Sequence, residues 1–232
     1  MQFRQGEGIG SVSDIFSEVD EEVRRERLKK LWERYGALLI AGCVVLVVAV
    51  GGWRAYNWYE AKKAAEAGAA FEAAVVLAEQ GKSKEAVEAF RRLESEGTPS
   101  YRMLAKFRQA GQLAQSDQHN ERQDAVALYD QLARDTSLGP TMQDFAAVRA
   151  ALILLDTASY DDIRARLEPL TALDRTFRHS ARATLALSAW RAKNTTAMQR
   201  WTDMILADAE TPAGTRGQIQ MLLALSDADK KS

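Results

Sequence analysis

Residues 35–53 read YGALLIAGCVVLVVAVGGW, a stretch of nineteen residues without a charged side chain. Nine of them are Leu, Ile or Val, and Arg34 and Arg54 flank the stretch on its two sides. As a helix it would be about 28 Å long, close to the roughly 30 Å hydrocarbon core of a bilayer. Core helices of soluble proteins seldom run this far without a polar face. The sequence therefore predicts a single membrane-spanning helix.

Basic and aromatic residues around this stretch predict its orientation. Aromatic side chains gather at both ends, as in the interfacial belts of membrane proteins: Trp32, Tyr35, Trp53, Tyr56, Trp58 and Tyr59. The segment before the stretch is more basic than the segment after it, which places the N-terminus in the cytoplasm. The upstream basic residues are Arg24, Arg25, Arg27, Lys29, Lys30 and Arg34, against Arg54, Lys62 and Lys63 downstream. We expect a cytoplasmic tail (1–34), a transmembrane helix with its aromatic belt (35–58) and an outer domain (59–232).

The tail is predicted to form a basic amphipathic helix that leads into the membrane. Apolar residues recur at helical spacing from Val19 to Tyr35, and Arg and Lys fill the opposite face. Such a helix can dock a cytoplasmic partner or bind the anionic headgroups of membrane lipid. The alternative is that its charges only set the orientation of the chain.

The composition of residues 54–232 bounds the class of the outer domain. The segment carries 24 Lys and Arg against 24 Asp and Glu, so no basic field is present to attract nucleic acid. The one cysteine, Cys43, lies in the apolar stretch, which leaves no disulfide framework outside it. Ala and Leu dominate, Pro is scarce, and no segment alternates like a strand. An all-α domain is predicted.

A pattern of one small, one large and one further apolar residue recurs at intervals of 39, 38 and 34 residues. Each copy follows a short polar turn, and another helical segment precedes each turn. The small residue lets two helices approach, and the large one fills the gap to the next hairpin. We therefore predict a tetratricopeptide-like α-solenoid of about four helical hairpins. The four copies are Ala86/Phe90/Leu93, Ala125/Tyr129/Leu132, Ile163/Leu167/Leu170 and Ala197/Trp201/Met204.

Prolines predict two irregularities in this array. Pro169 falls inside the second helix of the third hairpin and should kink or shorten it. Thr211 and Pro212 resemble an N-cap and a first-turn proline that open a last helix through Ser226. That helix would cap the exposed face of the fourth hairpin.

Motifs that carry chemistry are missing from the sequence. His119 and His179 have no cysteine or second histidine at metal-ligand spacing, so we expect no metal site. Phosphate-binding loops, nucleophile elbows and zinc-protease motifs are also absent. We expect a non-enzymatic protein without a cofactor. The alternative, an enzyme, would need a pocket with strongly perturbed titratable groups near one of the histidines.

Three arginines are the candidate protein-binding residues. Arg108, Arg149 and Arg182 each fall midway along the first helix of a predicted hairpin, where they could receive carboxylates or backbone carbonyls of a ligand. The alternative is that they pair with nearby acids on a solvated face. Their spacing to the small residue of their repeat varies (17, 14 and 15 residues), which favours the alternative.

Three stretches of the chain together resemble the YfgM-type family, the ancillary subunit of the bacterial Sec translocon. They are DIFSEVDEEVRRERLKKLWERYG (14–36), GWRAYNWYEAKKAAEAGAAFEAA (52–74), and FRHSARATLALSAWRA (177–192) with DAETPAGTRGQIQMLLAL (208–225). The resemblance implies an inner-membrane protein whose repeat domain lies in the periplasm. It also implies two partners, the Sec channel subunits and PpiD, a membrane-anchored, prolyl-isomerase-like chaperone. A scaffold of another envelope assembly, for cell division or cytochrome maturation, would have the same architecture.

Overall fold

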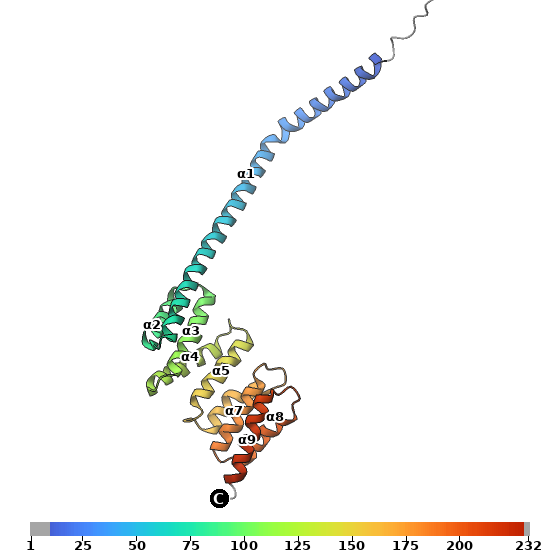
Figure 1. The fold of residues 1–232 in the computed structure, drawn as a ribbon. Coiled ribbons are helices and arrows are strands. Elements are labelled where there is room, and N and C mark those ends of the chain that lie inside the picture. Colours follow the sequence, from blue (N-terminus) through green and yellow to red (C-terminus); the bar gives the residue numbers. More distant parts are fainter. Residues whose placement is uncertain (1–9, 230–232) are drawn as a thin grey trace, which may run out of the picture. The chain divides into compact units, whose positions relative to one another are not determined.

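The computed structural model describes the backbone of residues 10–229, with side chains for 25, 26 and 29–228. Within these residues every regular element is helical, which confirms the predicted all-α fold (Figure 1). The elements are α1 (Gly10–Glu79), α2 (Ser83–Glu96), α3 (Pro99–Ala114), α4 (His119–Arg134), α5 (Pro140–Leu154), α6 (Tyr160–Leu167), η1 (Glu168–Thr171), α7 (Arg178–Arg191), α8 (Thr195–Ala207) and α9 (Ala213–Asp229). The chain divides into two compact units, residues 1–62 and 63–232.

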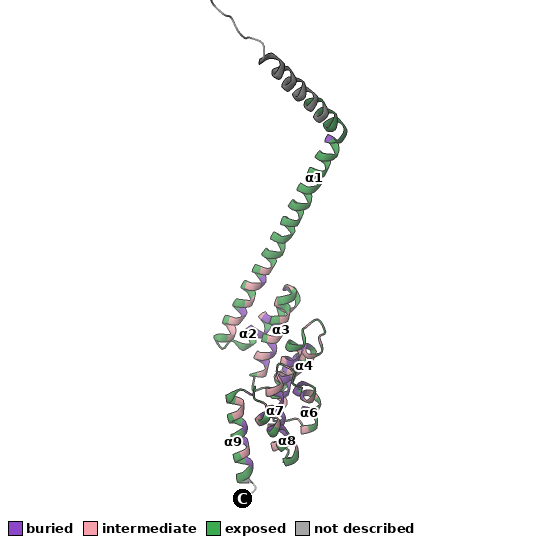
Figure 2. Cartoon of the chain, turned by 90° about the vertical axis from the view of Figure 1, so that its right-hand side faces the viewer, coloured by how far each residue is buried: buried purple, intermediate pink, exposed green. Residues whose placement is uncertain are grey.

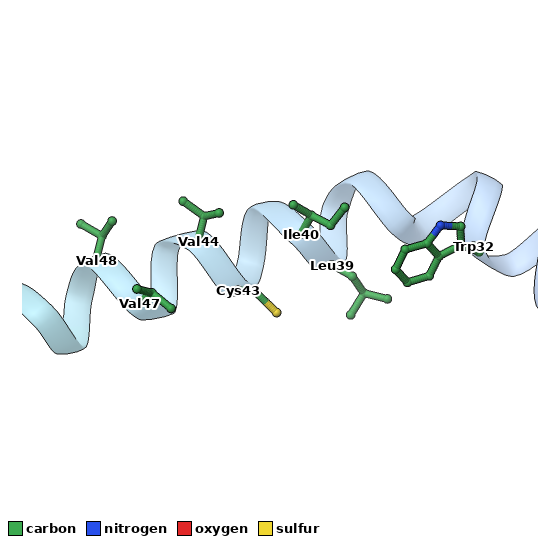
Figure 3. A pocket seen from close by; sticks show the side chains of 7 residues that line it. All are labelled: Trp32, Leu39, Ile40, Cys43, Val44, Val47 and Val48. Carbon is green, nitrogen blue, oxygen red and sulfur yellow. The ribbon is translucent and has the colours of Figure 1, made fainter.

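The first unit contains the apolar stretch of α1, whose residues are exposed except for Gly36 (Figure 2). Leu38 is 69% exposed and Val45 68%. In the described part of the chain, only α1 includes a segment long and apolar enough to cross a membrane. The indole ring of Trp32 lies against Gly36, where a Cβ would approach it to 3.3 Å. An apolar hollow on the same helix is lined by Trp32, Leu39, Ile40, Cys43, Val44, Val47 and Val48 (Figure 3).

Helix α1 continues without a break from the apolar stretch into the first repeat. Tyr101 of α3 packs against this helix at Gly68. A Cβ at residue 68 would lie 2.8 Å from the Tyr101 hydroxyl, so a larger residue would push that side chain away. The helix ends in a Schellman motif, in which Gly81 adopts a φ of +75°. The Gly81 amide donates to the Ala78 carbonyl, and the Lys82 amide to the Leu77 carbonyl.

The second unit consists of helical hairpins, as the repeat pattern predicts. The end of α1 pairs with α2 through Ala67, Ala74 and Phe90, and three further pairs follow, namely α3 with α4, α5 with α6, and α7 with α8. Local capping fixes two of the turns. The Ser159 hydroxyl accepts from the Asp162 amide at the start of α6, and the Asn194 side chain accepts from the Ala197 amide at the start of α8.

The core confirms the small–large pattern in three copies and shifts it in the fourth. All nine pattern residues of the first three copies are buried. In the fourth copy Trp201 is fully buried, but Ala197 and Met204 are only half-buried. Met198 and Ile205 are buried in their place, because α8 presents the face one residue further round to the core. At these two positions the fourth copy therefore lies one residue later than the sequence predicts.

The two proline predictions have different outcomes. Helix α6 ends at Leu167 and continues as the short 3-10 helix η1, which confirms the shortening expected from Pro169. At α9 the Pro212 carbonyl accepts the first helical bond from the Arg216 amide, whereas the Thr211 hydroxyl donates to the Ile205 carbonyl at 2.8 Å. Thr211 thus ties the turn to α8, and its expected N-cap bond is not formed. Ile219 and Leu222 of α9 join the core of α7 and α8, as expected of a capping helix.

Candidate protein-binding surface

From α2 to α8, charges segregate between alternate helices, whereas the end of α1 in the first hairpin carries Glu66, Glu72 and Glu79. Helices α3 and α7 contain basic residues and no Asp or Glu, and α5 contains only one acid, Asp144. The even-numbered helices α2, α4, α6 and α8 all carry acids among their bases. The carboxyl group of Asp144 is buried and paired with Arg175, so it offers no negative charge to the surface. The exposed charges of α3 and α5 are therefore positive.

Aromatic rings connect α3 and α5. Phe107 of α3 and Phe145 of α5 have ring centroids 5.6 Å apart, and Phe107 also contacts Tyr129 of α4 at 6.3 Å. Phe107 and Phe145 are half-buried, so part of each ring faces solvent. Leu104 and Leu152 continue the same helix faces and are 37% and 44% exposed. We name the surface of Leu104, Phe107, Arg108, Phe145, Arg149 and Leu152 the α3–α5 face.

Arg149 is one of the two cations of this face. Its guanidinium lies over the ring of Tyr129, 5.9 Å from the centroid. Its Nε is buried without a hydrogen-bond partner, and no carboxylate of the described residues pairs with it. Gly111 of α3 borders the same ring, and a Cβ at residue 111 would lie 3.6 Å from the Tyr129 hydroxyl, an ordinary contact distance. The Arg149 charge has thus lost part of its hydration without gaining an opposite charge.

Arg108 is the second cation of the face. It lies one helical turn beyond Leu104 on α3, and its side chain is exposed. Among the described residues it has no ion pair or side-chain hydrogen bond. Arg108 and Arg149 can both donate hydrogen bonds to the carboxylate of a ligand without first breaking an internal ion pair.

The third predicted arginine, Arg182, has a different environment. It is 2% exposed, and its Nε and Nη2 both donate to the Thr171 carbonyl, at 3.1 and 2.7 Å. Its Nη1 donates to Asp208 at 2.9 Å. These contacts join α7 to η1 and to the end of α8, and none involves α3 or α5. Arg182 is therefore not part of the α3–α5 face, and a binding role for the three arginines stays a prediction.

Asp208 is the centre of a charged cluster at the end of α8. Arg178 donates to it at 3.1 Å and Arg182 at 2.9 Å. The hydrogen bond from Arg178 is the largest cause that lowers the pKa of Asp208 to about 2. Burial, followed by the nearby charge of Arg178, lowers the pKa of His179 beside it. Because the Thr211 hydroxyl donates its single proton to Ile205, His179 must donate from Nδ1 to Thr211.

The tetratricopeptide repeat-like domain family model matches residues 29–185, about two thirds of the chain. The chain belongs to this family. The match begins at Lys29 and so includes the apolar stretch as well as the hairpins through most of α7. Comparisons with curated proteins and with solved structures gave no match. Tetratricopeptide repeat-like domains are in general protein-interaction modules, which places the α3–α5 face in a domain of that kind.

Sequence reasoning selected Arg108 and Arg149 but missed their apolar neighbours. Phe145 and Arg149 are one helical turn apart, and this spacing is visible in the sequence. The absence of acids from 99–114 was also visible there. The contact between Phe107 and Phe145 was not, because it joins helices from two different hairpins.

Proposed function

We propose that this protein is a membrane-anchored protein-binding module. In this proposal the apolar stretch, with its aromatic belt (35–58), crosses the inner membrane of a bacterial cell. The tail (1–34) lies in the cytoplasm and the repeat domain (59–232) in the periplasm. One observation carries the proposal: α1 contains both the exposed apolar stretch and Ala67 and Ala74 of the repeat core. A single helix thus supplies a segment suited to a bilayer and the first helix of a binding domain.

We further propose that the module is an ancillary subunit of the Sec translocon. It would recruit a periplasmic chaperone of the PpiD type, or cooperate with it, on chains that emerge from the channel. Tethering beside the channel raises the effective concentration of the repeat domain, so weak contacts with a partner become effective. The support for this step is the resemblance of residues 14–36, 52–74, and 177–192 with 208–225, to the YfgM-type family.

The cytoplasmic segment offers the sharpest test of the channel association. Residues 14–34 are replaced by a neutral linker of equal length, and recovery of channel subunits with the purified protein is measured. We expect recovery to fall while the repeat domain keeps its thermal unfolding transition. Unchanged recovery would contradict a docking role of this segment at the channel.

Two controls accompany this experiment. A variant in which only Arg25, Lys29 and Lys30 become Gln separates the effect of charge from that of the helix. A C-terminal alkaline phosphatase fusion of each variant reports whether the repeat domain still lies outside the cytoplasm, since removal of basic residues can invert a span.

A further inference from the structure

We propose that the α3–α5 face binds an acidic segment of a partner protein in which Asp or Glu residues lie among apolar residues. This inference rests on the proposed function, because it names the ligand chemistry of the same protein-binding domain. It concerns a protein ligand, and the argument has three steps: the charge of the face, the state of its arginines and its apolar surface.

The charge of the face selects an anionic ligand. Arg108 and Arg149 are its only charged residues, and the one acid of the two helices, Asp144, is buried against Arg175. A basic segment would meet two like charges here, and a neutral one would leave both unpaired. Electrostatic complementarity therefore favours Asp and Glu side chains.

The lack of an internal carboxylate partner for Arg149 also favours an acidic ligand. From α5 onward, each of the other described arginines already has an internal partner: Arg164, Arg166, Arg175, Arg178, Arg182, Arg191, Arg200 and Arg216. Arg149 is half-buried and has only the Tyr129 ring beneath it. A carboxylate that reaches this guanidinium would supply the charge-assisted hydrogen bonds that the chain itself does not provide.

The apolar part of the face sets the second requirement. Leu104 and Leu152 expose more than a third of their surface, and the half-buried rings of Phe107 and Phe145 contact each other on the same two helices. These side chains contribute to binding only if the ligand also brings apolar groups. A purely acidic tract would satisfy the arginines and leave the leucines in water, so the ligand must combine the two kinds of residue.

The experiment selects ligands from a random twelve-residue peptide library displayed on phage. The target is the full-length protein in lipid nanodiscs, with empty nanodiscs used to remove lipid binders. We expect the selected peptides to be enriched in Asp or Glu together with Leu, Ile or Phe. The same selection on the Arg108→Gln, Arg149→Gln double variant should lose the acidic enrichment.

Affinity measurements on one selected peptide give the quantitative test. Each single arginine variant should weaken binding by about tenfold, and so should exchange of the peptide's acids for amides. The matched control is the Arg92→Gln, Arg122→Gln double variant, which removes the same charge from exposed positions on α2 and α4. It should bind the peptide like the unmodified protein. Because Arg108 is exposed, its variant reports binding even if substitution of Arg149 lowers stability.

Several outcomes overturn the inference. They are selection of peptides without acidic enrichment, selection of none, equal enrichment on the double variant, or equal loss with the control variant. If the empty nanodiscs remove the acidic peptides, those peptides bind lipid and not the protein, which also overturns the inference. Failure here leaves the proposed function standing if channel subunits and a chaperone still co-purify with the protein, so the two failures are distinguishable.

Discussion

Arg149 on α5 covers the ring of Tyr129 on α4 with a guanidinium that has no acidic partner among the described residues. Tyr129 itself is only 2% exposed and belongs to the core between α3, α4 and α5. The contact therefore joins the packing of the second repeat to the α3–α5 face. A ligand that reaches Arg149 would touch a side chain supported directly by the core.

Substitution of Tyr129 tests this support. Tyr129→Leu removes the aromatic ring from the core and should lower the free energy of unfolding by about 2 kcal/mol. Tyr129→Phe keeps the ring and should change it by less than about 1 kcal/mol. Urea unfolding followed by circular dichroism measures both. If Phe is as damaging as Leu, the hydroxyl rather than the ring holds these helices together.

Arg108 and Arg182 each lie midway along the first helix of a hairpin, but the structure gives them different roles. Arg182→Met removes four helix-joining hydrogen bonds from a buried site and should destabilise the repeat domain by about 3 kcal/mol. Arg108→Met changes an exposed residue without internal partners and should stay within about 0.5 kcal/mol of the original protein. Thermal unfolding of the two variants decides the assignment. Similar melting temperatures would show that the Arg182 contacts add no stability.

Asp208 should make the free energy of unfolding depend on pH in the acidic range. Its pKa of about 2 lies below the value near 3.9 expected in the unfolded chain, so the unfolded state binds the proton more readily. The stabilisation is present in full above pH 4 and is lost as the pH falls toward 2. The difference in unfolding free energy between the protein and its Asp208→Asn variant should therefore shrink over this interval. A difference that is constant from pH 6 to pH 2 would contradict the ion-pair explanation.

Two helical glycines should respond in opposite ways to the same substitution. Gly68→Ala places a Cβ 2.8 Å from the Tyr101 hydroxyl and should destabilise the first repeat by about 1 kcal/mol or more. Gly217→Ala meets no atom within 4 Å and should stabilise α9 by about 0.5–1 kcal/mol. Melting temperatures give the sign of each change. A stabilising Gly68→Ala would mean that Tyr101 moves aside at little cost.

Charge placed in the apolar stretch should prevent its insertion in a membrane. Val45→Lys with Val47→Lys would cost about 5–7 kcal/mol near mid-bilayer, so the protein should become extractable by alkaline carbonate. The matched control is Val76→Lys with Leu225→Lys, two exposed apolar positions outside the stretch. Its membrane fraction should stay unchanged. Equal extraction of both variants would contradict membrane anchoring by residues 35–53.

Local signals predicted the helices and their turns, because these depend on residues close in sequence. Gly81, Ser159 and Pro169 each act within one or two turns of their own position, and each lies where a helix begins or ends. The fourth repeat lies one residue later than predicted at two positions because both members of each neighbouring pair, Ala197 and Met198 or Met204 and Ile205, are apolar, so helical periodicity alone does not choose between them. Only the packing of α8 against α7 and α9 determines which of each pair is buried.

The candidate surface was less predictable for a related reason. Arg182 could not be separated from Arg108 and Arg149 by sequence, since its partner Asp208 lies 26 residues away on another helix. Thr211 was expected to cap α9, but its hydroxyl donates to the carbonyl of Ile205 in the folded turn. Contacts between hairpins decided both outcomes, and the periodicity of a single helix does not contain them.

The central claim is that α1 anchors a protein-binding repeat domain at the Sec channel. Affinity purification of the full-length protein in mild detergent, with partners identified by mass spectrometry, tests it most directly. A variant that contains only the tail and the span is the control for contacts made by the membrane segment alone. We predict recovery of Sec channel subunits together with a periplasmic chaperone of the PpiD type, with the chaperone lost from the control. Recovery of cell-division or cytochrome-maturation proteins instead would contradict the claim.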